Sequence, residues 1–130
     1  VIGVIIGLDS LQRYNLRADM DRGALLLQKA RSSAINNIGD GIVETKHGVY
    51  FDNIGNKFVL FRGNDYSSRV TNFDINIDKS PNAIVTLNPT SPLEIVFDPL
   101  SGKARDVEVT ITDGVRTIKI NVNEEGLIDW

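Results

Sequence analysis

Cysteine is absent from this chain of 130 residues, and histidine, methionine and tryptophan each occur once. The absence of cysteine excludes a disulfide scaffold, a thiolate metal site and a cysteine nucleophile together. A strong excess of one charge is lacking too, since the formal net charge is -3 and the sequence pI is about 5.1. Composition therefore provides no global attraction to nucleic acid, which leaves only a local basic patch to consider.

Residues that could carry catalysis are scarce as well. The single histidine, His47, lies in a Lys-His-Gly segment that we predict to be a solvent-facing turn between two strands. The sequence contains no Gly-x-Ser-x-Gly elbow and no phosphate-binding glycine loop. Residues 74–78 alternate oxygen-bearing side chains as a calcium loop does, but the apolar residues between them favour a strand. We therefore expect no catalytic residue, no cofactor and no metal ligand, and a protein that is not an enzyme.

Proline is rare, and none of the four prolines interrupts the first forty residues, which can form one long helix. From Leu16 onward, apolar and small residues recur at steps of three and four, which places them on one stripe of that helix. A helix of about thirty residues is about 45 Å long at 1.5 Å per residue, so one end should project from the domain. The residues predicted to pack on a sheet are Leu16, Met20, Leu27, Ala34 and Ile38.

The first eight residues are the apolar end of this segment. They are rich in β-branched residues and glycine, and the spacing of Asp9 and Gln12 would also allow a helix to begin afresh near Ser10. The run is shorter than the about 20 residues that span a bilayer, so we expect either a processed chain or the remainder of a longer hydrophobic segment. The residues predicted to contact lipid or neighbouring helices are Val1, Ile2, Val4, Ile5, Ile6 and Leu8.

After Gly41 the apolar period changes from about three and a half to two, which predicts β structure to the end of the chain. Asp113-Gly114 between two such runs predicts a tight hairpin. We predict an α+β fold with a helical unit of residues 1–38 and a globular antiparallel β domain of residues 39–130, in two sheets. The predicted strands are residues 42–46, 48–52, 57–62, 69–77, 83–87, 93–97, 106–112, 115–122 and 127–128.

A small set of basic residues lies near the predicted C-terminal hairpin: Lys103, Arg105, Arg116 and Lys119. Strand pairing could bring several of them to one face, which would make a weak, salt-sensitive DNA contact. Acidic residues in the same region oppose this interpretation, among them Asp106, Glu108 and Asp113. DNA is therefore a minor alternative among the expected partners.

Several strings, in this order along nearly the whole chain, resemble type IV pilin-like proteins and, among them, the minor pseudopilins of the GspH/FimT group. The apolar start of residues 1–8 and the strings of residues 17–22 and 27–35 are similar to the N-terminal helix of that family. The strings that resemble its β-hairpins, its recurrent glycine turn and its closing strand are residues 47–51, 58–61, 95–102, 118–123 and 126–128.

The resemblance implies a type IV pilin-like fold, in which a long N-terminal α-helix packs against antiparallel β-sheets. It also implies a structural subunit of a type IV pilus, a competence pilus or a type II secretion pseudopilus, which is anchored in the inner membrane with an extracytoplasmic domain. Its partners would be other pilin or pseudopilin subunits, the inner-membrane assembly platform and, through the helix, the membrane. The alternative is an extracytoplasmic β module that binds DNA, a polysaccharide or a secreted substrate through residues 63–68 and 88–92.

Overall fold

The computed structural model describes residues 2–36, 44–89 and 92–130, with side chains from Asn15 onward. Within these residues one helix, α1 (Ile2–Ile35), precedes eight strands and a short 3-10 helix, η1 (Thr71–Phe73). The strands are β1 (His47–Asp52), β2 (Lys57–Arg62), β3 (Ile75–Asp78), β4 (Ile84–Asn88), β5 (Glu94–Phe97), β6 (Val107–Thr112), β7 (Thr117–Val122) and β8 (Ile128–Asp129).

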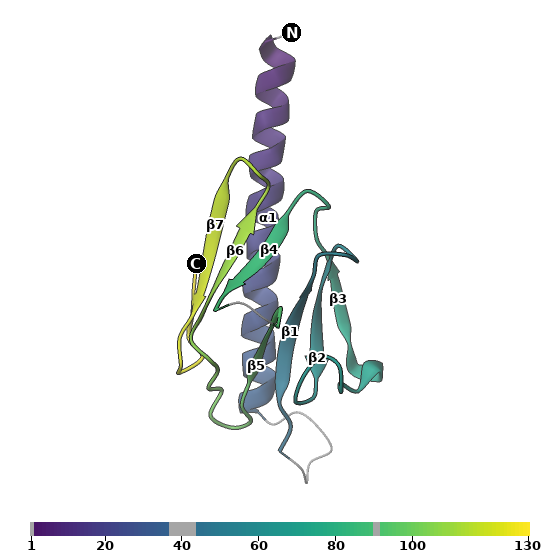
Figure 1. The fold of residues 1–130 in the computed structure, drawn as a ribbon, viewed down its shortest axis with the longest axis vertical. Helices are drawn as coiled ribbons and strands as arrows, with labels where there is room; N and C mark the ends of the chain where they lie inside the picture. Colours follow the sequence, from purple (N-terminus) through teal and green to yellow (C-terminus); the bar gives the residue numbers. More distant parts are fainter. Residues whose placement is uncertain (1, 37–43, 90–91) are drawn as a thin grey trace.

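The strands form two antiparallel four-stranded sheets, as expected from their number. The first sheet has the order β3-β2-β1-β5 and the second has the order β4-β6-β7-β8 (Figure 1). A hairpin connects β6 and β7 at Asp113-Gly114 as predicted, but the predicted two-residue turn is wrong, because Thr112 lies opposite Thr117 and β7 begins at Thr117 and not at residue 115. Gly114 has φ +92°, a conformation that favours glycine.

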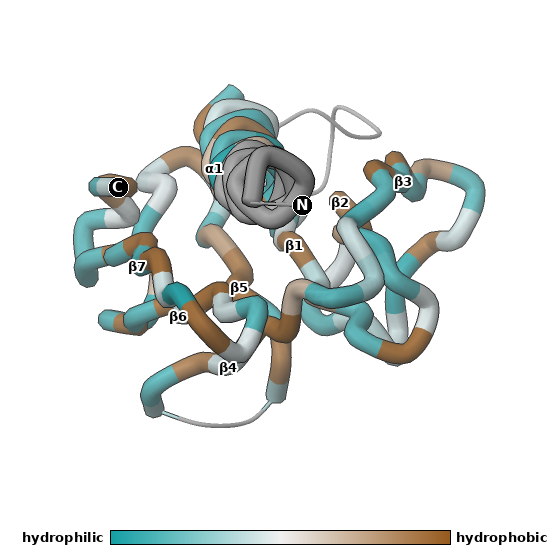
Figure 2. Tube along the Cα trace, turned by 90° about the horizontal axis from the view of Figure 1, so that it is seen from above, coloured by the Kyte–Doolittle hydropathy of each residue, from teal (hydrophilic) through white to brown (hydrophobic). Residues whose placement is uncertain are grey.

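Helix α1 contacts strands of both sheets: β1, β2 and β5 of the first, and β6, β7 and β8 of the second. Figure 2 shows β1 and β2 toward one side of the helix and β6 and β7 toward the other. Three alanines of α1 have no exposed surface, and their small side chains let the two sheets approach the helix closely. The edge-to-face rings of Phe51 and Phe58, 5.5 Å apart, fill the core beneath the first sheet. The helix and both sheets therefore share one hydrophobic core, whose helical members are Leu16, Met20, Ala24, Leu26, Leu27, Ala30 and Ala34.

The predicted fold class, a type IV pilin-like fold with a long helix packed against antiparallel sheets, is wrong in that form. The structure is compatible with an α+β fold, but most of its described core is sheet, built from eight strands in two sheets. The helix is not laid along a sheet over its length, because its N-terminal part extends beyond both sheets and the part from Leu16 to Ala34 lies between them (Figure 1). The physical reason is that the apolar stripe of the helix packs against two sheets and not against one.

Two predicted strands are also wrong. Residues 44–46 are not in a strand, and residues 42–43 lie outside the described residues. The predicted strand of residues 69–77 begins only at Ile75, because the Arg69 guanidinium binds both carboxylate oxygens of Asp74, at 3.2 and 2.9 Å, and closes a turn over η1. A local ion pair therefore overrides the alternating apolar pattern.

The helix runs without a break past Ser10, so the new start considered there does not occur. It ends at Ile35, ahead of the predicted end of the helical unit at residue 38, and residues 37–43 lie outside the described residues. Among the described residues, no helix combines the length and the hydropathy that a membrane crossing requires.

Candidate functional site

The structure describes four of the five helix residues that the sequence predicts to pack on a sheet. Leu16, Met20, Leu27 and Ala34 are all buried in the core. Ile38, the fifth, lies outside the described residues. Of the predicted contact residues at the apolar end, Ile2, Val4, Ile5, Ile6 and Leu8 lie in the backbone of α1, their side chains are not described, and Val1 lies outside the described residues.

The C-terminal end of α1 is fixed by two glycine turns. The backbone N–H of Leu100 donates to the carbonyl of Ala34 at 2.9 Å and satisfies one of the free carbonyls at the helix end. Gly102, at φ +69°, lies against Ile35, and Gly126, at φ +82°, lies against the carbonyl of Gly102. The recurrent glycines noted in the sequence therefore serve to bring two loops against the last turn of the helix.

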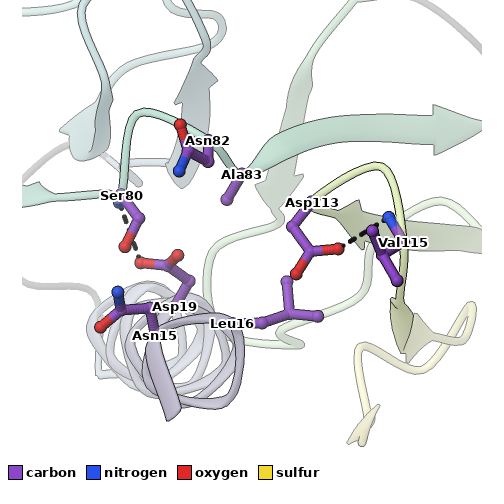
Figure 3. Close-up of a pocket in the computed structure, with 8 residues that line it drawn as sticks. All are labelled: Asn15, Leu16, Asp19, Ser80, Asn82, Ala83, Asp113 and Val115. Atoms are coloured by element: carbon purple, nitrogen blue, oxygen red, sulfur yellow. Dashed lines mark hydrogen bonds between the residues drawn. The ribbon is translucent and has the colours of Figure 1, made fainter. Parts of the chain in front are cut away.

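A polar pocket of about 230 Å³ lies on the opposite part of the helix, between α1, residues 80–83 and the β6–β7 turn (Figure 3). Three segments that are distant in the sequence contribute its walls. Its lining residues are Asn15, Leu16, Asp19, Ser80, Asn82, Ala83, Asp113 and Val115.

Asp19 is the most unusual of these residues, because its carboxylate is fully buried at 0% exposure. Its Oδ1 accepts hydrogen bonds from the backbone N–H of Ser80 and from Nη1 of Arg22, each at 3.1 Å. Lys79 is also buried, and its Nζ donates to the carbonyls of Ser80 and Ala83. Burial lowers the pKa of Lys79, while the nearby carboxylates of Asp19 and Asp52 act in the opposite direction. The buried carboxylate of Asp19 thus ties the segment from Lys79 to Ala83 to the helix, while Lys79 binds carbonyls within that segment.

Asp113 forms the other polar wall of the pocket. Its Oδ1 accepts the backbone N–H of Val115 at 2.9 Å and that of Arg116 at 2.7 Å, which closes the hairpin turn. Hydrogen bonds from Arg116 and then Val115 lower the pKa of Asp113. The carboxylate is therefore ionised at neutral pH.

The basic residues considered for DNA contact do not gather in one patch. Lys103 and Arg105 precede β6, whereas Arg116 lies in the turn after it, which separates them by the length of the strand. Arg105 donates to the carbonyls of Pro89, Pro92 and Glu94, at 3.1 to 3.3 Å. Lys119 pairs with Glu108 at 3.3 Å. Arg105 and Lys119 are thus bound to groups of the chain itself.

The prediction for His47 is wrong, because the residue is buried, 3% exposed, at the start of β1. It stands opposite Arg62 of β2 and Phe97 of β5 in the sheet register. The strand begins one residue earlier than expected and lies between two neighbours, which removes His47 from solvent.

The first loop of the alternative interpretation, residues 63–68, is held by Glu94 of β5, whose carboxylate accepts the backbone N–H of Tyr66 at 2.7 Å. The Tyr66 ring stacks on Tyr50 at 3.9 Å, and the Arg69 guanidinium lies 3.7 Å from the Tyr66 centroid. This aromatic cluster packs the loop of residues 63–68 onto the first sheet. Residues 90 and 91 of the second loop lie outside the described residues.

Asp19 and Lys79 were not singled out from the sequence. The signal for Asp19 was available, because it stands three residues after Leu16 and four before Gly23, on the buried stripe of the helix. A carboxylate in that position must be buried with a partner or face a polar cavity. No comparable sequence pattern indicates that Lys79 is buried, because its burial depends on the path of the loop after β3.

A scan against protein-family models, a search of curated proteins and a search of solved structures each found no match for this chain.

Proposed function

We propose that this chain is a non-enzymatic structural subunit, a minor pilin or pseudopilin, that assembles through its N-terminal helix. The filament would be a type IV pilus, a competence pilus or a type II secretion pseudopilus. The partners would be other subunits and the inner-membrane assembly platform, with the β domain on the extracytoplasmic side.

The observation that carries the proposal is the division of α1 into two parts. The part from Leu16 to Ala34 buries its apolar stripe between the sheets, whereas the earlier part extends beyond them (Figure 1). In the sequence, that earlier part begins with eight residues of which six are Val, Ile or Leu. Lipid tails and apolar helices are similar environments for such residues, so exchange between a membrane and a helical bundle is nearly neutral and permits reversible assembly.

Deleting residues 1–8 tests this proposal. The deletion removes none of the described core, so we expect the β domain to keep its melting temperature while incorporation into filaments or membrane-bound assemblies is lost. Co-sedimentation of the tagged subunit with assemblies measures incorporation, and thermal unfolding followed by circular dichroism measures the fold. Val115→Ser is a matched control, since Val115 is 80% exposed at the tip of the β6–β7 hairpin and should be incorporated normally. Normal incorporation of the deleted chain would refute the proposal.

The second candidate is a ligand-binding β module, and the Tyr50, Tyr66 and Arg69 cluster favours it because stacked rings and a guanidinium suit sugars and bases. The support is smaller, since Tyr50 and Arg69 both lie against the Tyr66 ring, and Glu94 and Asp74 bind the backbone of Tyr66 and the side chain of Arg69. These contacts already account for the cluster as packing of the loop.

A further inference from the structure

An open groove of about 310 Å³ lies between the second half of α1 and the segment that leads into β8. The C-terminus lies on the β7 side of α1 (Figure 2). Ile35 and Ile128 in the groove are half-buried, and Leu127 is 56% exposed. The groove can therefore take an apolar side chain from another molecule. Its helix wall consists of Gln28, Arg31, Ser32 and Ile35, and its other wall is Gly126, Leu127 and Ile128.

The rim of this groove is acidic. Glu124, Glu125 and Asp129, which we call the acidic rim, flank the second wall in the sequence and are all exposed. Within the part of the chain that the structure describes, none of these three carboxylates forms an ion pair. Arg31 alone is charged among the lining residues, and its Nη2 donates to the carbonyl of Glu125 at 3.5 Å. Three anions against one cation favour a partner that combines an apolar side chain with a positive charge.

The chain carries such a combination on the face of α1 that points away from the sheets. Leu25 is 62% exposed there. Lys29 follows it by four residues, which places it on the next turn of the same face, and it is exposed and forms no ion pair with a described residue. Asp21 and Arg22 on the preceding turn carry opposite charges, and Arg22 is already bound to Asp19. Lys29 is therefore the cation beside Leu25 that is available to a partner.

We propose that the groove binds a second copy of this chain, with Leu25 of that copy against Leu127 and with its Lys29 opposite the acidic rim. Two acidic rims placed against each other would repel, which favours the helix face of the other copy over its C-terminal segment. An exposed apolar side chain on one copy and a pocket on the next form the kind of contact that links copies into assemblies. Residues 1–8 take no part in this contact, so the inference does not rest on the proposed function.

Charge reversal in the full chain tests this contact. Sedimentation velocity over a range of protein concentrations measures self-association, and circular dichroism verifies that each variant is folded. We expect Lys29→Glu to raise the dissociation constant about tenfold, because an attraction becomes a repulsion. About 0.5 M NaCl should weaken the wild type in the same direction, since salt screens exposed charges. Leu25→Ser should weaken the contact without changing the melting temperature.

The decisive variant combines Lys29→Glu with Glu125→Lys and Asp129→Lys, which exchanges the charges of the two surfaces. We expect this combination to restore self-association to within about threefold of the wild type, which a role of Lys29 in folding alone would not explain. Lys119→Glu is the matched control, since Lys119 is exposed on β7 and the charge change is the same. A wild type that stays monomeric, equal association of Lys29→Glu and Lys119→Glu, or a combined variant that remains as weak as Lys29→Glu would overturn the inference.

Discussion

Replacing Leu27 with aspartate is expected to abolish the cooperative unfolding transition of this protein. Leu27 has no exposed surface and lies in the core that α1 shares with the sheets. The substitution removes a large apolar side chain, which alone costs about 2–5 kcal/mol, and buries a charge without a partner. The sum is comparable with the whole stability of a domain of this size, about 5–15 kcal/mol.

The matched control for this substitution lies two residues away on the same helix. Leu25 is 62% exposed, so Leu25→Asp introduces the same charge into water and should change the stability by no more than about 0.5 kcal/mol. Thermal unfolding followed by circular dichroism measures both variants. A Leu27→Asp chain that is soluble and melts as the wild type does would show that the helix stripe is not the core of the molecule.

Replacing Gly126 with alanine should have the second largest effect. An added Cβ would lie 1.9 Å from the carbonyl oxygen of Gly102, which is backbone and cannot move alone. The φ of +82° also disfavours any L side chain. Because the two loops hold the last turn of α1, we expect a loss of about 3 kcal/mol and a fall in melting temperature of about 10 °C.

Gly114→Ala is the control for this variant, because it introduces the backbone strain of a positive φ without the steric clash that an alanine at residue 126 would make. Gly114 has φ +92°, but an added Cβ meets nothing within 4 Å, so only the conformational cost of about 1 kcal/mol remains. Chemical denaturation of both variants gives the difference in the free energy of unfolding. Equal losses in the two variants would mean that the contact between Gly126 and Gly102 does not contribute to holding the helix.

The helix stripe and most of the strands could be predicted from the sequence, because both depend on local periodicity. Leu16, Met20, Leu27 and Ala34 recur at helical spacing and are buried, and Asp113-Gly114 encodes its own turn. The way the helix sits between two sheets could not be predicted, since it depends on which strands pair across long distances. That gap explains why the specific fold class expected from the resemblance was wrong.

The polar pocket could not be predicted from local sequence patterns either. Asp19 and Asp113 are 94 residues apart in the sequence, and they line one pocket because α1, residues 80–83 and the β6–β7 turn lie together. His47 failed for a related reason, since its burial depends on the neighbouring strands β2 and β5 and not on its own Lys-His-Gly segment. Arg69 and Asp74 form an ion pair that periodicity does not detect.

The proposed division of α1 into a part that packs on the sheets and a part that assembles with other subunits is tested most directly by site-specific cross-linking. The sequence has no cysteine, so an introduced thiol is the only one in the chain. In cells that build the filament, Ile5→Cys should form cross-links between subunits in the assembled fraction, whereas Val115→Cys, exposed on the hairpin, should not. An Ile5→Cys subunit that stays monomeric within assemblies, or cross-links through Val115→Cys instead, would contradict assembly through the N-terminal helix.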